Sequence, residues 1–323
     1  MIISRTPFRV SFAGGGSDLK QYYSQNGGAV LSTTINKYVY LSMHPYFNSN
    51  KIFLKYSKSE LVDSIGEIEH RIIRQVFSDY NIMGVDLSSS ADIPAGTGLG
   101  SSSAFTAGLI SLCNAYINKY MSKEDIAKYA CEIEIEKLKE PIGKQDQYAS
   151  AIGGINFFAF NPDNSVSIEK VILGTNKLKT LQNRLMIYYL GETRSASKIL
   201  IEQNENIKND KRKVKFLKSM VDLAYSLKKD LCNNNIDTFG EILDTGWNYK
   251  KELTSTISNT KVDHYYNLAR KNGAVGGKLL GAGGSGFLLF YVPEGKQEQI
   301  KIILNELKQL QFEFDSNGTT IIY

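Results

Sequence analysis

Apolar and polar positions in the first half of the chain predict strands separated by helices. Residues 3–12 alternate along the segment, and residues 29–43 are rich in β-branched and aromatic side chains, so both are predicted strands. Further strands are expected at 84–92, 155–160 and 166–173, and helices at 68–80, 101–120, 123–139 and 146–152. The first half therefore mixes both kinds of element.

The second half is mainly helical between residues 195 and 272. The second region begins at 185–190, strands are expected at 287–292 and 319–322, and a helix at 294–310. Because strands and helices follow one another without regular alternation, we predict an α+β fold. The polar stretch 161–180 separates two regions, so we place a boundary near residue 175, with domains 1–175 and 176–323.

Composition excludes several classes of protein. Hydrophobic residues are 42% of the 323 and charged residues 22%, which is typical of a soluble globular chain. The longest apolar stretch, 104–117, falls short of the ~20 residues of a membrane helix, so no membrane partner is expected. The start of the chain lacks a secretion signal and the three cysteines are widely spaced, which favours a cytoplasmic location. A net charge of +5 without a dense basic block argues against nucleic acid and suits a small anionic ligand.

Glycines gather in three distant segments. Residues 14–16, 96–100 and 273–286 hold 13 of the 27 glycines. One such cluster usually marks a turn, but three together predict backbone that approaches a ligand closely. The segment 281–286 formally matches G-x-G-x-x-G, yet the apolar strand 287–292 follows it instead of a helix, so a dinucleotide site is excluded.

The segment 94–104 is the central candidate site. Its glycines free the loop, and a helix predicted to begin near Ser101 would present unpaired N–H groups and a positive dipole end to an anion, phosphate above all. The serines at the helix start can cap it, bind phosphate or bind Mg²⁺. A glycine loop followed by an ordinary helix cap would have the same pattern. The segment is not a P-loop, since no Gly-Lys-Ser/Thr follows.

Glu134 falls on the apolar face of its predicted helix. Counting helical turns places it beside Ala127, Ala130, Cys131 and Leu138. An inward carboxylate requires a partner, and a metal ion is one candidate. A partly exposed glutamate at the edge of the helix is the alternative.

Two aspartates have both a structural and a chemical interpretation. Asp146 precedes a helical stretch and is either an N-cap or a carboxylate that orients, or takes the proton of, an attacking hydroxyl. Lys144 or Arg9 would keep it ionised. Asp18, after three glycines, is either a turn residue or an acceptor for sugar hydroxyls.

Three motifs together resemble the GHMP family of small-molecule kinases. They are residues 5–18 (RTPFRVSFAGGGSD), residues 94–104 (PAGTGLGSSSA) and residues 278–286 (KLLGAGGSG). Within the family, the phrases PFRVSFAGGGSDL, EPIGKQDQYASAIGG and GGKLLGAGGSGFLL are similar to the heptose 7-phosphate kinases. Gly15 and Gly16 stand where galactokinases have Glu-His, so galactose is not the expected substrate.

The resemblance implies a fold, a reaction and ligands. The expected fold is an N-terminal domain like domain 2 of ribosomal protein S5 and a C-terminal ferredoxin-like domain, with the site in the cleft. The expected reaction moves the γ-phosphoryl group of ATP, with Mg²⁺, onto the anomeric hydroxyl of D-glycero-D-manno-heptose 7-phosphate, in the synthesis of nucleotide-activated heptose and surface glycans. The partner is thus a small sugar phosphate, and the protein is expected to be a monomer or a homodimer.

The resemblance also assigns roles to residues. Asp146 and Arg9 match the catalytic pair, and Ser102 and Glu134 the Mg²⁺ ligands. The ATP phosphates would be bound by Pro94, Gly96, Gly98, Leu99, Gly100, Ser101, Ser102 and Ser103. The sugar would be bound by Gly15, Gly16, Ser17, Asp18, Gly283 and Gly284.

A phosphate already on the substrate requires a cation. Arg194 is the first candidate, Lys144 and Lys278 are weaker ones, and Lys250 or Trp247 is a possible lining residue. The alternatives are another sugar-1-kinase, for L-fucose or an N-acetylhexosamine, and a non-catalytic nucleotide or sugar sensor on the same fold. A fucose or hexosamine kinase would not need the Arg194 clamp.

Overall fold

The first half of the chain builds a large, mostly antiparallel sheet. A computed structural model describes residues 1–47, 50–191 and 196–323. The nine-stranded sheet has the order β13-β1-β2-β5-β3-β4, and β2 also pairs with β12 and with β6, which in turn pairs with β7. Its strands are β1 (Ile2–Ala13), β2 (Gly28–Pro45), β3 (Ile52–Lys55), β4 (Ser59–Val62), β5 (Val85–Ala91), β6 (Asn156–Phe160), β7 (Val166–Lys170), β12 (Phe314–Asp315) and β13 (Thr320–Ile321).

Strand β1 lies between β2 and the short edge strand β13, and it carries site residues into the interior. Its register with β2 shifts after Pro7, which has no N–H to donate to the ladder. Every residue of β1 from Thr6 onward is buried, so both faces of the strand are covered. Arg9 and Ser11 bond to side chains of α5, whereas Phe12, the next residue, packs edge-on against Phe239 of α9 at 5.0 Å. One strand therefore carries polar groups to one side and apolar groups to the other.

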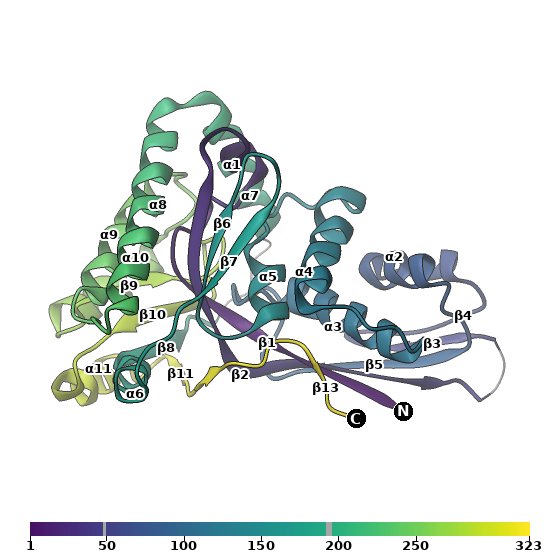
Figure 1. Cartoon of the computed structure of the whole chain (residues 1–323). Helices are drawn as coiled ribbons and strands as arrows, with labels where there is room; N and C mark the ends of the chain where they lie inside the picture. Colours follow the sequence, from purple (N-terminus) through teal and green to yellow (C-terminus); the bar gives the residue numbers. More distant parts are fainter. Residues whose placement is uncertain (48–49, 192–195) are drawn as a thin grey trace.

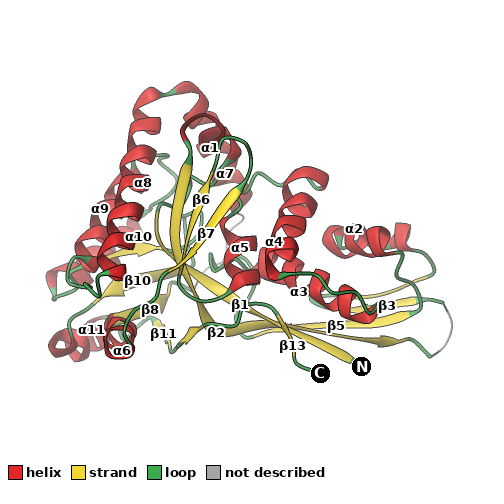
Figure 2. Cartoon of the chain, in the orientation of Figure 1, coloured by secondary structure: helices red, strands yellow, loops and turns green. Residues whose placement is uncertain are grey.

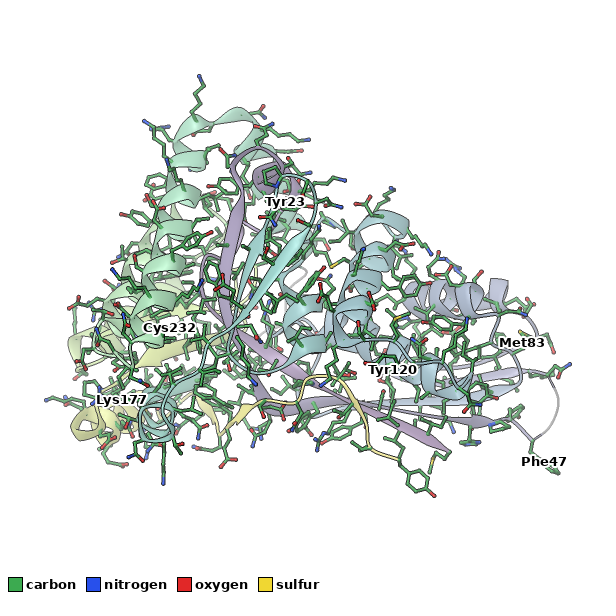
Figure 3. All side chains as sticks on the ribbon, viewed as in Figure 1. Tyr23, Phe47, Met83, Tyr120, Lys177 and Cys232 are labelled. Atoms are coloured by element: carbon green, nitrogen blue, oxygen red, sulfur yellow. The ribbon has the colours of Figure 1, made fainter. Side chains whose placement is uncertain are left out.

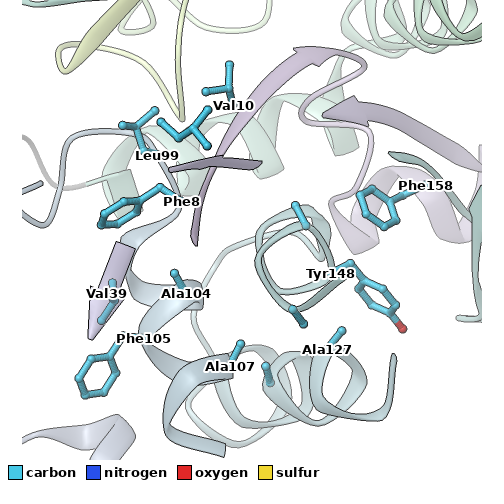
Figure 4. Close-up of a cluster of buried hydrophobic side chains, with 14 of the residues drawn as sticks. Phe8, Val10, Val39, Leu99, Ala104, Phe105, Ala107, Ala127, Tyr148 and Phe158 are labelled. Carbon is cyan, nitrogen blue, oxygen red and sulfur yellow. The ribbon is translucent and has the colours of Figure 1, made fainter. Parts of the chain in front are cut away.

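Helices of the first half gather on one side of this sheet (Figure 2). They are α2 (Arg71–Tyr80), α3 (Ser101–Tyr116), α4 (Lys123–Cys131) and α5 (Gln145–Ile152), with the short α1 (Lys20–Asn26) at the end of β1. Helix α3 is buried from Ser103 to Asn114. A side chain at Gly108 would come within 2.7 Å of Thr6 Oγ1, so this glycine lets α3 lie directly on β1. Figure 4 shows the resulting core, with Phe8, Leu99 and Ala104 together.

The predicted helix 123–139 changes its winding after Cys131. Residues Glu132–Lys137 form a π-helical turn, a rare form that is frequent at functional sites. Glu134 is fully buried within it, and Glu132 and Glu136 are exposed, as the helical count predicted.

The second half forms a separate four-stranded antiparallel sheet. Its order is β11-β8-β10-β9, which in chain order is fourth, first, third, second, the arrangement of a ferredoxin-like domain. The strands are β8 (Leu185–Tyr189), β9 (Gly276–Leu279), β10 (Phe287–Tyr291) and β11 (Lys308–Leu310). The helices are α6 (Thr175–Arg184), α7 (Ala196–Asn209), α8 (Lys211–Cys232), α9 (Phe239–Lys251), α10 (Thr260–Lys271) and α11 (Gln297–Ile303). The predicted two-part α+β fold is confirmed.

Several sequence predictions need correction. The helix expected at 294–310 ends at Ile303, and residues 308–310 are strand β11. The polar stretch 161–180 contains the start of α6, and β3, β4, β8, β9 and β12 were not predicted. Strand β9 begins with Gly276 and Gly277, which have no side chain to signal a strand.

The two halves are joined by packing and by the end of the chain (Figure 1). Helices α8 and α9 pack on β1 and β2, and one apolar core runs through both halves. Strands β12 and β13 return to the first sheet, where β13 pairs with β1 beside the N-terminus. The boundary near residue 175 stays a proposal, with this C-terminal tail assigned to the first sheet.

The described part of the chain contains neither a membrane-spanning helix nor a disulfide. Across residues 1–47, 50–191 and 196–323, no helix has the length and apolarity to span a membrane. The three cysteines are free; Cys113 and Cys131 are buried, and Cys232 lies exposed at the end of α8 (Figure 3).

Candidate active site

The second and third glycine-rich segments interlock. Gly98 and Gly281 both have positive φ, at 87° and 78°, and a Cβ on Gly281 would lie 2.5 Å from the Gly98 Cα. A Cβ on Gly286 would lie 2.3 Å from the Thr97 carbonyl oxygen. These positions require glycine because the two loops touch through their backbones. The tertiary fold thus brings together segments that are about 180 residues apart in the sequence.

A cleft of about 350 Å³ opens where these loops meet β1. Both halves of the chain contribute to its wall, including most of the predicted site residues. Those that line it are Arg9, Gly15, Gly16, Asp18, Gly96, Gly98, Gly100, Ser101, Ser102, Ser103, Glu134, Asp146 and Gly283.

Helix α3 begins at the cleft wall with its N-terminus uncapped. Its N-cap residue is Gly100, in the left-handed conformation with φ of 78°, and no described side chain caps it. Sixteen residues of helix direct a positive dipole end and free N–H groups toward the space beside Ser101 and Ser102. Both the loop and the helix therefore favour a phosphate there.

Glu134 lies directly behind this helix start. Its Oε1 accepts a hydrogen bond from Ser102 Oγ at 2.7 Å, and its Oε2 accepts one from Ser103 Oγ at 2.8 Å and one from Gln147 Nε2 at 2.7 Å. Burial raises the pKa of Glu134, and these three donors oppose that rise. The partly exposed alternative is wrong, because Glu134 is 0% exposed.

The side-chain oxygens of Ser102 and Glu134 are suitable ligands for a magnesium ion. Mg²⁺ prefers hard oxygen ligands and is usually bound through one or two protein groups plus substrate phosphates. Ser102 Oγ and Glu134 Oε1 lie 2.7 Å apart on the cleft wall beside the phosphate-binding helix end. The described residues contain no cluster of three acidic, cysteine or histidine side chains for an all-protein cage.

Asp146 forms a two-pronged ion pair with Arg9. Arg9 Nε donates to Asp146 Oδ1 and Nη2 donates to Oδ2, each at 2.8 Å. Arg9 Nη1 donates to the Gly98 carbonyl at 2.6 Å. Asp146 lies in the first turn of α5, whose N-cap is Lys144, so the N-cap interpretation of Asp146 is wrong. Lys144 is not its partner, since Lys144 Nζ bonds to the carbonyl and the side chain of Asn164.

Asp18 is held beside the start of α5, close to Asp146. Its Oδ1 accepts from the Gly16 N–H at 2.9 Å and its Oδ2 from the Gln145 N–H at 3.1 Å. Burial raises the pKa of Asp18, the neighbouring Asp146 raises it further, and the backbone donors lower it. A Cβ on Gly143 would lie 1.9 Å from Asp18 Oδ2, so the carboxylate occupies the space of a missing side chain. Asp18 therefore stabilises the turn, as the structural interpretation predicted, and it also lines the cleft; its role toward sugar hydroxyls stays a prediction.

Four predicted site residues do not line the cleft. Pro94 is exposed at the outer end of its loop, and the Leu99 side chain is buried in the core. Ser17 Oγ donates to the Gly14 and Ala29 carbonyls, and the Gly284 N–H donates to the Ile257 carbonyl at 2.8 Å. These residues shape the loops from behind. Arg194 lies outside the described residues.

Polar groups that the sequence did not single out complete the site. Gln145 and Gln147 are buried beside Asp146, and both bond to site residues. The sequence did carry a signal for them: one glutamine stands on each side of Asp146, in a helix that otherwise contains mostly small or apolar residues. Trp247 is core, as expected of a lone tryptophan, while Lys250 and Lys278 do line the cleft.

Comparisons with known proteins agree with this architecture. Residues 53–154 match the family model for the GHMP kinases N terminal domain, and residues 227–310 match the GHMP kinases C terminal model. The D-glycero-alpha-D-manno-heptose 7-phosphate kinase of Campylobacter jejuni is 30% identical to the chain, over 98% of the chain and 97% of that protein. The bifunctional fucokinase/GDP-fucose pyrophosphorylase of Arabidopsis thaliana is 28% identical over 76% of the chain and 23% of its own length.

A solved structure shows the same fold throughout. The crystal structure of a D-glycero-D-manno-heptose 1-phosphate kinase from Bacteroides thetaiotaomicron superposes with a TM-score of 0.82. The match covers 100% of this chain and 99% of that one, at 23% identity. With two family models and an end-to-end relative in agreement, the chain belongs to the GHMP kinase family and is an ATP-dependent phosphotransferase.

Proposed function

We propose that this kinase phosphorylates the anomeric hydroxyl of D-glycero-D-manno-heptose 7-phosphate, forming the 1,7-bisphosphate. The observation that carries the proposal is the end-to-end similarity to a heptose 7-phosphate kinase, 30% identical over 98% of the chain. The product would serve the synthesis of nucleotide-activated heptose for surface glycans, in the cytoplasm, where ATP is supplied.

The nucleotide side of the site is the loop at residues 96–103. We place the ATP phosphates against the start of α3, where the helix dipole and the loop N–H groups neutralise part of their charge. Ser102 and Glu134 would hold Mg²⁺, which supplies further neutralisation of the transferring group. Gln147 and Ser103 keep the Glu134 carboxylate oriented for that purpose.

The acceptor side is the Asp146–Arg9 pair with Asp18. In the proposed step, the anomeric oxygen forms a bond to the γ-phosphorus, the bond from that phosphorus to the β,γ-bridging oxygen breaks, and ADP leaves. Asp146 orients the hydroxyl and takes its proton. Arg9, only 5% exposed, supports Asp146 from behind and leaves the cleft side of the carboxylate free for substrate.

The sugar itself would lie between Asp18 and the first glycine segment. A Cβ on Gly16 would lie 2.5 Å from Gln203 Nε2 on α7, so the Gln203 amide packs against the glycine backbone at this edge of the cleft. The Asp18 carboxylate is suited to accept hydrogen bonds from sugar hydroxyls. Arg194 remains the proposed clamp for the 7-phosphate, on the strength of the sequence alone.

A sugar panel tests the proposal. ADP release would be followed with ATP, Mg²⁺ and D-glycero-D-manno-heptose 7-phosphate, the unphosphorylated heptose, mannose, mannose 6-phosphate, fucose and galactose. Phosphorus NMR would locate the new phosphate. We expect selective turnover of the 7-phosphate with a new anomeric phosphate; turnover of free sugars only would refute the heptose 7-phosphate assignment.

A second candidate substrate is L-fucose. Similarity over 76% of the chain to a fucokinase-containing protein favours it, and fucose carries no phosphate. The panel separates the two, because a fucose kinase would use fucose and would be unaffected by Arg194→Gln, whereas a heptose 7-phosphate kinase would lose affinity for its substrate.

A further inference from the structure

A lysine from the second half of the chain enters the cleft. Lys250 lies in the last turn of α9, is 6% exposed and lines the same cleft as the start of α3. Its Nζ donates a hydrogen bond to the Gly281 carbonyl. An ammonium group has three donors, so two remain for a ligand.

This ammonium has no anionic neighbour within ion-pair distance in the described part of the chain. A buried charge without a counter-ion is costly unless a ligand supplies one. Burial lowers the pKa of Lys250 to about 8, with Arg9 lowering it and Asp18 and Asp146 raising it. Lys278 is the other cation nearby, and its own pKa is lowered by burial, then by Lys250 and Arg9.

The contacts of Gly281 place the ammonium next to the phosphate loop. Gly281 packs on Gly98, whose carbonyl accepts a bond from Arg9, and Arg9 holds Asp146. Lys250, Gly98, Arg9 and Asp146 line the same cleft, and the charges of Arg9, Asp18 and Asp146 all act on the Lys250 ammonium. The ammonium is therefore close to both the phosphate loop and the acceptor-side ion pair.

We infer that Lys250 is a catalytic residue that donates hydrogen bonds to the equatorial oxygens of the phosphoryl group during transfer. This inference rests on the proposed function. The bonds made and broken are those given above; the hydroxyl proton goes to Asp146, and Lys250 keeps its proton throughout. Its contribution is electrostatic, because negative charge on the phosphoryl oxygens meets a fixed cation that is buried.

Lys278 differs from Lys250 in its contacts. Its Nζ donates to the Phe12 carbonyl at 3.1 Å, so it ties β9 to β1. Lys251, the next residue on α9, is half-buried outside the cleft, with its ammonium 5.9 Å from the ring centre of Trp247. Lys251 therefore provides a matched control on the same helix.

The test compares Lys250→Met with Lys251→Met under saturating ATP and sugar. We expect kcat of Lys250→Met to fall roughly 10²- to 10³-fold, the loss typical of one transition-state donor, with KM for ATP and sugar changed less than about threefold. Lys251→Met should keep kcat within about twofold. Unchanged kcat with a raised KM for a phosphorylated sugar would overturn the inference and make Lys250 a clamp for the substrate's own phosphate.

A charge-conserving variant keeps the inference testable if Lys250→Met does not fold. Wild-type kcat should fall above pH about 8 as the Lys250 ammonium loses its proton. Lys250→Arg should retain activity above that pH, because arginine stays protonated. If kcat of Lys250→Arg falls above pH about 8 just as kcat of the wild type does, the inference is overturned.

The choice of substrate separates this inference from the proposed function. The measurements use whichever sugar the panel shows to be phosphorylated, so a different sugar refutes the function and leaves the Lys250 test intact. If the panel yields none, slow hydrolysis of ATP gives the same readout, because the transferred group is the same. Equal hydrolysis by Lys250→Met and wild type would then overturn the inference.

Discussion

Arg9 and Asp146 share two parallel hydrogen bonds of 2.8 Å, although 137 residues separate them in the chain. The third nitrogen of the same guanidinium holds the Gly98 carbonyl at 2.6 Å. One side chain on β1 thus links the proposed proton acceptor to the proposed phosphate loop. Their relative position is set by a planar group with fixed donor geometry.

Arg9→Lys tests this link, because an ammonium cannot make the two parallel bonds and hold Gly98 as well. A hydrogen bond to a charged group contributes ~1.5–3 kcal/mol, so we expect kcat to fall roughly tenfold to a hundredfold. Steady-state kinetics would measure it. Arg5→Lys is the control, since Arg5 lies on the same strand but stacks over Tyr38 at 4.6 Å, away from the cleft. An equal loss in both variants would assign the effect to β1 as a whole.

Asp146→Asn should abolish most turnover without disturbing the nucleotide. Asparagine keeps the shape of the side chain but cannot take the hydroxyl proton, so we expect a loss of ~10²- to 10⁴-fold in kcat. Titration with a non-hydrolysable ATP analogue should show binding within about threefold of wild type. Asp163→Asn, in an exposed turn, is the control. Substantial activity in Asp146→Asn would remove this residue from the catalytic step.

Glu134→Gln should weaken the response to Mg²⁺ and stabilise the ligand-free protein. The metal concentration for half-maximal activity should rise, because a neutral amide is a poorer ligand than a carboxylate. Burial raises the pKa of Glu134, so its contribution to stability is present in acid and is lost as the pH rises through its folded-state pKa. The melting-temperature advantage of Glu134→Gln should therefore grow from acid toward neutral pH. An unchanged Mg²⁺ titration would leave Glu134 with a purely structural role.

Gly281→Ala should separate the interlocked loops. At φ of 78° a Cβ would lie 2.5 Å from the Gly98 Cα, so the loops must move apart. Strain of this kind costs about 1–3 kcal/mol, and we expect thermal unfolding to shift accordingly and the KM for ATP to rise. Gly295→Ala is the matched control, because a Cβ there meets no atom within 4 Å. Equal changes in thermal unfolding and in the KM for ATP in both variants would contradict the close contact between Gly281 and Gly98.

Local sequence patterns were sufficient to predict many of the helices and strands and the residue types of the site. Strands β1 and β2 and helix α3 were predicted because hydrophobic periodicity is a property of neighbouring residues. The inward orientation of Glu134 followed from a count along one helix, and it was correct despite the π-helical turn. The family resemblance then added the two-part architecture and the roles of the motifs.

Which side chains come into contact could be read from the folded structure alone. Arg9 instead of Lys144 pairs with Asp146, Gly281 packs on Gly98, and Lys250 points its ammonium into the cleft. The strand pairing of β9, which begins with two glycines, also became clear only in the fold. So did the return of β12 and β13 to the first sheet. Each depends on contacts between distant parts of the chain, which hydrophobic burial and close packing select and which no local pattern encodes.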